Sequence, residues 1–155
     1  MKSVQKALKR RADGEKGFTL IELLVVVIIL GILAAIAVPI YLNQRKSAWN
    51  ATTESDVKNA SLVVESAASA AGGDYSEITF PQSCTSESDC TLTAGGEDYK
   101  ITVSKHVTLS FPSHDKDGYK IQGTNDSATG LKTYTYDSNT GKVTTEAAKK
   151  AADKG

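Results

Sequence analysis

The sequence predicts an α+β fold in which one long N-terminal helix packs against a small antiparallel β-sheet. Three features predict this class. An uncharged apolar run fills residues 23–42, helical periodicity continues beyond it, and short alternating runs separated by turn residues occupy the C-terminal half. At 155 residues, the chain has the length of one ordinary domain.

The charge balance is neutral overall but uneven along the chain. There are 18 Lys and Arg residues against 18 Asp and Glu residues. Residues 1–17 carry six basic and two acidic side chains, whereas residues 18–155 carry 12 basic and 16 acidic ones. The neutral total argues against a nucleic-acid binder that relies on bulk charge, and the uneven split indicates two different environments.

The apolar run over residues 23–42 is long enough to cross a membrane. Its 20 residues carry no charge, and as a helix they would span about 30 Å, the thickness of a bilayer core. Basic residues on the N-terminal side place residues 1–17 in the cytoplasm and residues 43–155 outside, as a single N-in, C-out pass. A secretory signal peptide would have a shorter run followed by small residues, so we favour a retained anchor.

Glu22 is the feature that a plain anchor does not explain. It lies four residues after Phe18, at the start of the apolar stretch. A charge at membrane depth costs about 2.5–3.5 kcal/mol on insertion scales, so an acid there suggests a function. The alternative is that this carboxylate lies near the cytoplasmic headgroups at little cost. The residues alone leave both interpretations open.

The helix is expected to continue past the membrane. Apolar residues at spacings of three and four, with charges between them, predict an amphipathic helix over residues 43–72, ended by the Gly-Gly pair after Ala71. A helix that starts near residue 18 would then measure about 80 Å, which suits a filament backbone. Pro39 lacks an N–H group and Gly31 is a weak helix former, so we expect a kink or local loosening there.

The remainder is expected to form a connecting loop over residues 73–98, an antiparallel sheet over residues 99–146 and a polar tail over residues 147–155. The loop segment is rich in Ser, Thr, Asp and Gly and has few apolar residues. One face of the sheet would cover the apolar stripe of the outer half of the helix. The expected strands are residues 99–103, 107–111, 118–122, 131–136 and 142–145.

Cys84 and Cys90 enclose five residues and lie outside the membrane by the orientation argument. An even cysteine pair in that compartment predicts a disulfide that staples a surface loop. So short a loop contributes about 2 kcal/mol in the loop-entropy treatment. A zinc site is not expected, because no histidines stand at finger spacing.

The remaining candidates for chemistry favour no enzyme. Residues 115–118 resemble the start of a calcium loop but lack its closing Glu, so a β-turn is the better interpretation. His106 and His114 have no recognisable partners and are expected at the surface. Phosphate-loop, serine-hydrolase and zinc-protease motifs are missing, so we expect no catalytic residue, metal site or cofactor. Glycosylation sequons occur at Asn50, Asn59 and Asn125, a number that chance supplies.

The segment KGFTLIELLVVVIILGILAAIAVPIY, which starts at Lys16, resembles the class III signal peptide of type IV pilins and the related pseudopilins. The resemblance covers about residues 14–50. It implies that residues 1–17 are a basic leader, cut on the cytoplasmic side between Gly17 and Phe18 by a prepilin peptidase, and that the new Phe18 amine is N-methylated. Unlike a usual signal peptide, the apolar helix over residues 18–42 would be kept.

The resemblance also implies how subunits assemble. The helices over residues 18–42 would bundle into a filament, and the segment between Gly31 and Pro39 would melt during assembly. Glu22 is the only acid in the apolar segment, so it is the natural partner of the Phe18 amine, in its own chain or in a neighbouring subunit. Such a buried pair fixes register more surely than it adds stability.

We therefore expect a type IV pilin, a structural subunit that is first a cytoplasmic-membrane precursor and then part of an extracellular pilus. The implied partners are other pilin subunits, the prepilin peptidase and methyltransferase, and the assembly platform protein with its ATPase. Adhesion, twitching motility or DNA uptake are the filament uses that the resemblance implies. The alternatives are a pseudopilin of a type II secretion or competence system and a monomeric membrane-anchored binding module. The long leader and the segment PIYLNQRKSA are similar to Gram-positive, actinobacterial prepilins.

Overall fold

The computed structural model describes residues 17–147. The chain divides into two compact units, Met1–Leu42 and Asn43–Gly155. The expected leader, apart from Gly17, and the expected tail, apart from Ala147, lie outside the described residues.

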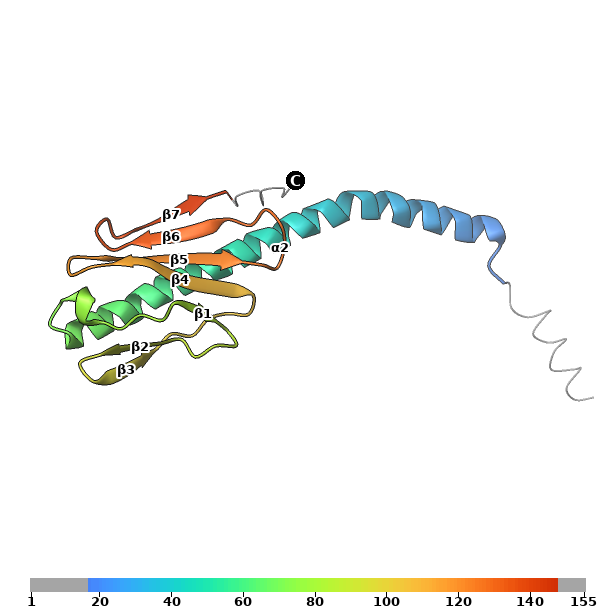
Figure 1. Cartoon of the computed structure of the whole chain (residues 1–155). Helices are drawn as coiled ribbons and strands as arrows, with labels where there is room; N and C mark the ends of the chain where they lie inside the picture. The colour runs from blue at the N-terminus through green and yellow to red at the C-terminus, as the bar shows by residue number, and fades with distance from the viewer. Residues whose placement is uncertain (1–16, 148–155) are drawn as a thin grey trace, which may run out of the picture. The chain divides into compact units, whose positions relative to one another are not determined.

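One helix, α2, runs from Leu20 to Ala70 and confirms the expected long N-terminal helix (Figure 1). It ends where the Gly-Gly pair predicts. The Gly73 N–H donates to the Ala68 carbonyl at 2.8 Å, and Gly72 and Gly73 both adopt positive φ angles, of 69° and 88°. This is the Schellman arrangement that closes many helices, in which glycine carries no steric penalty.

The second unit contains two antiparallel sheets (Figure 1). The larger has the strand order β1-β4-β5-β6-β7, and the smaller is a β2-β3 hairpin. All paired strands are antiparallel, which confirms the predicted α+β class. A short 3₁₀ helix, η1 (Tyr75–Glu77), follows α2. The strands are β1 (Ser83–Thr85), β2 (Thr91–Ala94), β3 (Glu97–Lys100), β4 (Val107–His114), β5 (Tyr119–Asn125), β6 (Thr133–Asp137) and β7 (Lys142–Glu146).

The expected connecting loop over residues 73–98 is wrong, because that segment contains η1, β1, β2 and the start of β3. These strands are only three or four residues long, too short for a clear alternating pattern. The prediction of a strand over residues 99–103 is also wrong for residues 101–103, since β3 ends at Lys100. Ile101 and Val103 are nevertheless buried, and the Ile101 N–H donates to the Cys90 carbonyl at 2.8 Å.

The core of the second unit lies between the five-stranded sheet and one face of α2. At Gly123 on β5, the sheet packs closely against the helix. A Cβ atom at this position would lie 2.5 Å from Val57 Cγ2 and 3.1 Å from Thr53 Cγ2. Fully or nearly fully buried residues from both elements fill this core, among them Val57, Ala60, Val64 and Ala67 from the helix and Leu109, Tyr119, Ile121 and Tyr134 from the sheet.

Polar side chains also fasten α2 to the rest of this unit. Asp56 is 5% exposed, and its carboxylate accepts the backbone N–H of Ser104 at 2.7 Å and the Ser104 hydroxyl at 3.0 Å. Asn50 accepts the backbone N–H of Lys132 at 2.9 Å. The backbone groups of α2 form their hydrogen bonds within the helix. The side chains of Asp56 and Asn50 therefore provide acceptors for loop N–H groups that have no partner strand.

Tyr119 and Glu65 make a further attachment between sheet and helix. The buried Tyr119 hydroxyl lies 2.9 Å from Glu65 Oε1 and 3.2 Å from the Ser61 carbonyl. The Tyr75 hydroxyl lies 3.3 Å from both Glu65 oxygens, and its ring packs against that of Tyr119 with centroids 5.0 Å apart. Burial, reinforced by the Glu65 carboxylate, raises the pKa of Tyr119 far above its usual range, so this hydroxyl stays protonated.

Candidate functional site

The Gly17–Phe18 junction lies just outside the helix. Both residues are exposed and precede α2, which begins at Leu20. Apart from Gly17 itself and its two sequence neighbours, no atom of the described chain lies within 4 Å of a Cβ built on Gly17, and Phe18 is 88% exposed. A peptide bond in such an open, non-helical segment is sterically available to an enzyme.

Glu22 closes the first turn of α2 together with Thr19. Its Oε2 accepts the Thr19 backbone N–H at 3.0 Å, while the Thr19 hydroxyl accepts the Glu22 backbone N–H at 3.3 Å. These reciprocal bonds form a capping box, and the carboxylate also interacts favourably with the positive end of the helix dipole. We did not predict this box, although the Thr-x-x-Glu spacing is its sequence signature.

The expected pairing of Glu22 with the Phe18 amine remains a prediction. In the uncut chain, the Phe18 nitrogen is part of the peptide bond to Gly17. Within residues 17–147, Glu22 Oε1 has no hydrogen-bond partner. One carboxylate oxygen therefore caps the helix and the other is available to a new cation.

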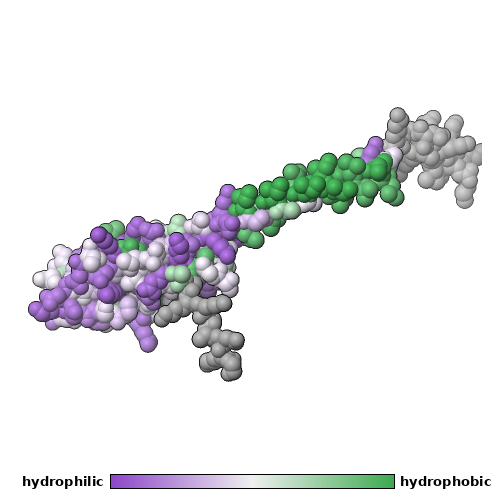
Figure 2. Space-filling model, turned by 90° about the horizontal axis from the view of Figure 1, so that it is seen from above, coloured by the Kyte–Doolittle hydropathy of each residue, from purple (hydrophilic) through white to green (hydrophobic). Residues whose placement is uncertain are grey.

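The helix surface that follows is almost entirely apolar on the face that Figure 2 shows. Every large apolar side chain between Leu20 and Leu42 is exposed, by between 47% and 84%. This is the one helix in the described part of the chain that is long and apolar enough to cross a membrane, by length and composition. An apolar surface of this extent is not stable in water, so it needs lipid or other helices around it.

The helix is continuous through Gly31 and Pro39. Pro39 cannot donate to the carbonyl of Ala35, four residues earlier, which leaves one acceptor in the apolar segment without its usual helical bond. The expected loosening between Gly31 and Pro39 therefore stays a prediction, with a specific missing bond as its physical basis.

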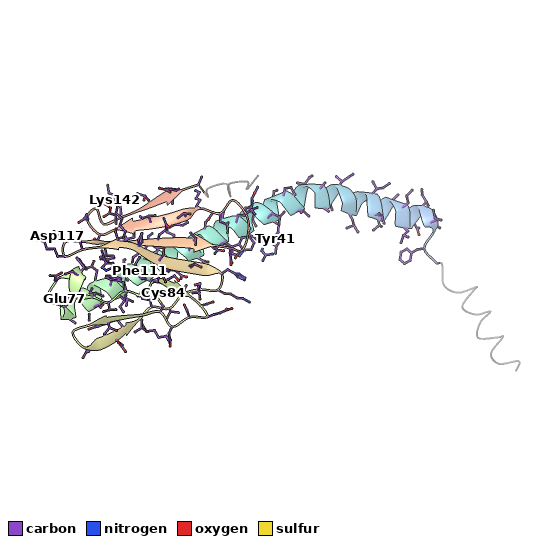
Figure 3. The ribbon with its side chains drawn as sticks, viewed as in Figure 1. Tyr41, Glu77, Cys84, Phe111, Asp117 and Lys142 are labelled. Carbon is purple, nitrogen blue, oxygen red and sulfur yellow. A yellow bond between two sulfur atoms is a disulfide. The ribbon has the colours of Figure 1, made fainter. Side chains whose placement is uncertain are left out.

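The two cysteines form a disulfide, Cys84–Cys90, with Cα atoms 5.0 Å apart. Both are buried, so the bond does more than staple a surface loop. Cys84 lies on β1 of the five-stranded sheet (Figure 3), and Cys90 immediately precedes β2 of the hairpin. The disulfide therefore connects the two sheets.

The other sequence candidates occupy turns. The carboxylate of Asp115 accepts the backbone N–H groups of Asp117 and Gly118, both at 2.9 Å, as in an Asx-type turn between β4 and β5. His106 does have a partner, contrary to expectation, because its Nδ1 lies 2.9 Å from Asp126 Oδ1. Sequence reasoning missed this pair because its members are 20 positions apart.

The potential ligands do not form a metal site. Within residues 17–147, no three His, Cys, Asp or Glu side chains are grouped to hold a metal ion.

Two of the three asparagines in glycosylation sequons already use their side chains in turns or loops. The Asn50 side chain accepts the Lys132 N–H, and the Asn125 side chain accepts the Ser127 N–H at 2.8 Å. The structure brings together an exposed Gly17–Phe18 junction, a capped acidic turn and an apolar helix.

Comparison with known families agrees with this arrangement. The model of the family described as the prokaryotic N-terminal methylation motif, the class III signal peptide of type IV pilins, matches residues 13–38. The match includes the Gly17–Phe18 junction, Thr19, Glu22 and Gly31. No solved structure matches the chain. This motif at the head of a long helix, which is joined to a small antiparallel sheet, supports a type IV pilin-like or pseudopilin-like protein.

Proposed function

We propose that the protein is a structural subunit of an extracellular type IV pilus, polymerised through residues 18–42. The observation that carries this proposal is the uncovered apolar surface of α2 between Leu20 and Leu42, most of which lies within the residues that the methylation motif matches. A plain anchor needs the apolar surface but neither an open Gly17–Phe18 junction nor an acid in the first helical turn. A subunit that leaves the membrane for a helical bundle has a use for all three features.

Processing would occur before assembly. A prepilin peptidase would cut between Gly17 and Phe18 on the cytoplasmic side, and a methyltransferase would then modify the Phe18 amine. The cut would leave a cation on Phe18, next to Thr19 and four residues before Glu22, the two residues that form the capping box. Because Oε2 of Glu22 already caps the helix, Oε1 is the oxygen that would receive this cation.

Pairing between Glu22 and the amine would set the register of subunits. Two charges taken out of water recover their desolvation cost only when they meet in good geometry, so a wrong register would leave both unpaired. The apolar contacts around them carry no such positional information, since neighbouring Leu, Val and Ile side chains are nearly equivalent. The pair would therefore select one axial position among many of similar packing energy.

The precursor would be a single-pass protein of the cytoplasmic membrane, and the assembly platform protein and its ATPase would move it into the filament. The head, from Asn43 onward, would supply the outer surface of the pilus and act without catalysis or cofactor. The second candidate is a pseudopilin of a secretion or competence system, because the motif is shared with that group.

The N-terminal peptide of material sheared from cells tests this proposal. Mass spectrometry should find N-methyl-Phe18 at the start of the protein in long sheared fibres. The same processed peptide found only in membranes would favour the pseudopilin. An intact leader on mature protein would refute the assigned processing and return the chain to a simple anchored protein.

Substitution of Glu22 separates its charge from its capping role. Glu22→Gln keeps an acceptor for the Thr19 N–H but has no charge, and we expect membrane insertion without filaments. Thr19→Ala is the matched control, because it weakens the same capping box by about 1 kcal/mol and keeps the carboxylate. Electron microscopy of sheared fractions would refute the charge pairing if Glu22→Gln made normal filaments.

A further inference from the structure

The second unit begins with a short basic and aromatic segment on α2. Arg45 and Lys46 are exposed, and Trp49, the single tryptophan of the chain, is half-buried. The guanidinium carbon of Arg45 lies 4.8 Å from the centre of the Trp49 ring, a cation–π contact. These residues lie shortly after the apolar run that ends at Leu42, with Asn43 and Gln44 between Leu42 and Arg45.

The position of this segment along the helix matches the headgroup layer of a bilayer. Arg45 and Lys46 follow Leu42 by three and four residues, a rise of about 4.5–6 Å, and the polar layer on each side of the hydrocarbon core is about 5–7 Å thick. Helical side chains lean toward the N-terminus, so the ring of Trp49 lies over the preceding turn, at the level of Arg45. The contact between the two side chains agrees with that level.

The chemistry of the three side chains fits a phospholipid surface. Tryptophan is enriched at membrane–water interfaces, where its ring meets the carbonyl region while its N–H stays hydrated. Arginine binds phosphate oxygens through its planar fork and lysine binds them as a compact cation. Each basic residue near an anionic leaflet adds to the attraction.

We propose that Arg45, Lys46 and Trp49 form a collar that binds anionic phospholipid headgroups of the outer leaflet while the precursor is in the membrane. The proposal rests on the membrane stage of the proposed function. The collar holds Leu42 at the outer boundary of the hydrocarbon core. The 20 residues of the apolar run then reach the inner boundary, which places Glu22 among the cytoplasmic headgroups, where its charge costs little.

The single tryptophan makes this collar measurable, because all tryptophan emission from the full-length protein comes from Trp49. The protein would be reconstituted into phosphatidylcholine vesicles with and without phosphatidylglycerol. We expect phosphatidylglycerol to shift the emission to shorter wavelength, to reduce quenching by aqueous iodide, and to increase quenching by lipids brominated near the headgroup. Inorganic phosphate added to phosphatidylcholine vesicles should not reproduce these changes.

Matched variants identify the residues responsible. The double variant Arg45→Gln, Lys46→Gln should lose the response to phosphatidylglycerol. Lys58→Gln should keep it, because Lys58 lies 12 positions further along α2 than Lys46 and is paired with Glu54 at 2.6 Å.

An identical Trp49 signal with and without phosphatidylglycerol would overturn the collar, as would a full response in the double variant. Strongest quenching by bromines deep in the acyl chains would also overturn it. Vesicle flotation distinguishes a failure of the collar from a failure of the membrane stage of the proposed function. Protein that floats with vesicles but leaves Trp49 in water refutes the collar alone, whereas protein that does not float refutes the membrane stage itself.

Discussion

The packing of Gly123 against α2 gives a prediction that tests the fold directly. A methyl group added at Gly123 would lie 2.5 Å from Val57 Cγ2, which is closer than two non-bonded carbon atoms can approach. Val57 is fully buried and β-branched, so it cannot rotate away cheaply. We expect Gly123→Ala to destabilise the second unit by about 1–3 kcal/mol, the usual cost of overpacking.

The same geometry predicts a compensating partner. Val57→Ala alone removes two methyl groups from the core and should cost about 2 kcal/mol or more. In the double variant, the new methyl of residue 123 enters the space vacated by Val57. The cost of the double variant should therefore fall below the sum of the two single costs by about 1 kcal/mol or more.

Thermal unfolding of the full-length protein in detergent micelles, followed by circular dichroism, measures these changes. A domain of roughly 100 residues loses about 4 °C in Tm for each kcal/mol, so Gly123→Ala should lower Tm by about 4–12 °C. Unchanged Tm in Gly123→Ala would refute the close packing of β5 on α2. Strict additivity in the double variant would refute the contact between residues 57 and 123.

Three further predictions concern the second unit. Asp56→Ala should lower its stability by about 1.5–3 kcal/mol, since the N–H and hydroxyl of the partly buried Ser104 lose a charged acceptor, and denaturant titration beside Asp56→Asn would show whether the charge matters. Reduction of Cys84–Cys90 should cost about 2 kcal/mol, and an equal Tm with and without reductant would contradict the link between the sheets. The pKa of Tyr119 in the folded protein is raised above the ordinary 10.0. Above about pH 10 the unfolded chain loses the tyrosine proton that the folded protein keeps. The free energy of unfolding should therefore be full below about pH 10 and fall as the pH rises further. Tyr119→Phe should make that alkaline fall shallower in unfolding curves collected across the pH range.

The features that sequence patterns predicted well are those with local causes. The 51-residue helix follows from periodicity and from a glycine pair that ends it, and four of the five larger-sheet strands follow from alternation between turn residues. The Gly17–Phe18 junction and Glu22 are recognisable because the methylation motif is contiguous in sequence. Local patterns of this kind need no knowledge of the tertiary fold.

The features that sequence patterns missed depend on distant partners. β1 is a strand because residues 83–85 pair with residues 108–110 of β4, which no local pattern reveals. From the sequence alone, Asp56 is interpreted as a solvated charge on the helix. Its burial depends on the fold, which brings Ser104, 48 residues away, into hydrogen-bond contact with it. The disulfide was predictable as a pair, but its position between two sheets depends on strands that were themselves unexpected.

The attachments along α2 also have a mechanical consequence. Asn50, Asp56 and Glu65 each hold a different part of the head, and they are spread over 15 residues, about 22 Å of helix. A pull along the helix axis would load all three contacts and the apolar seam beside them at once, in shear. Bonds loaded in parallel must fail together, whereas bonds peeled from one end fail singly. A fibre built from this subunit would therefore resist tension along its axis better than a sideways force that lifts the sheet from the helix.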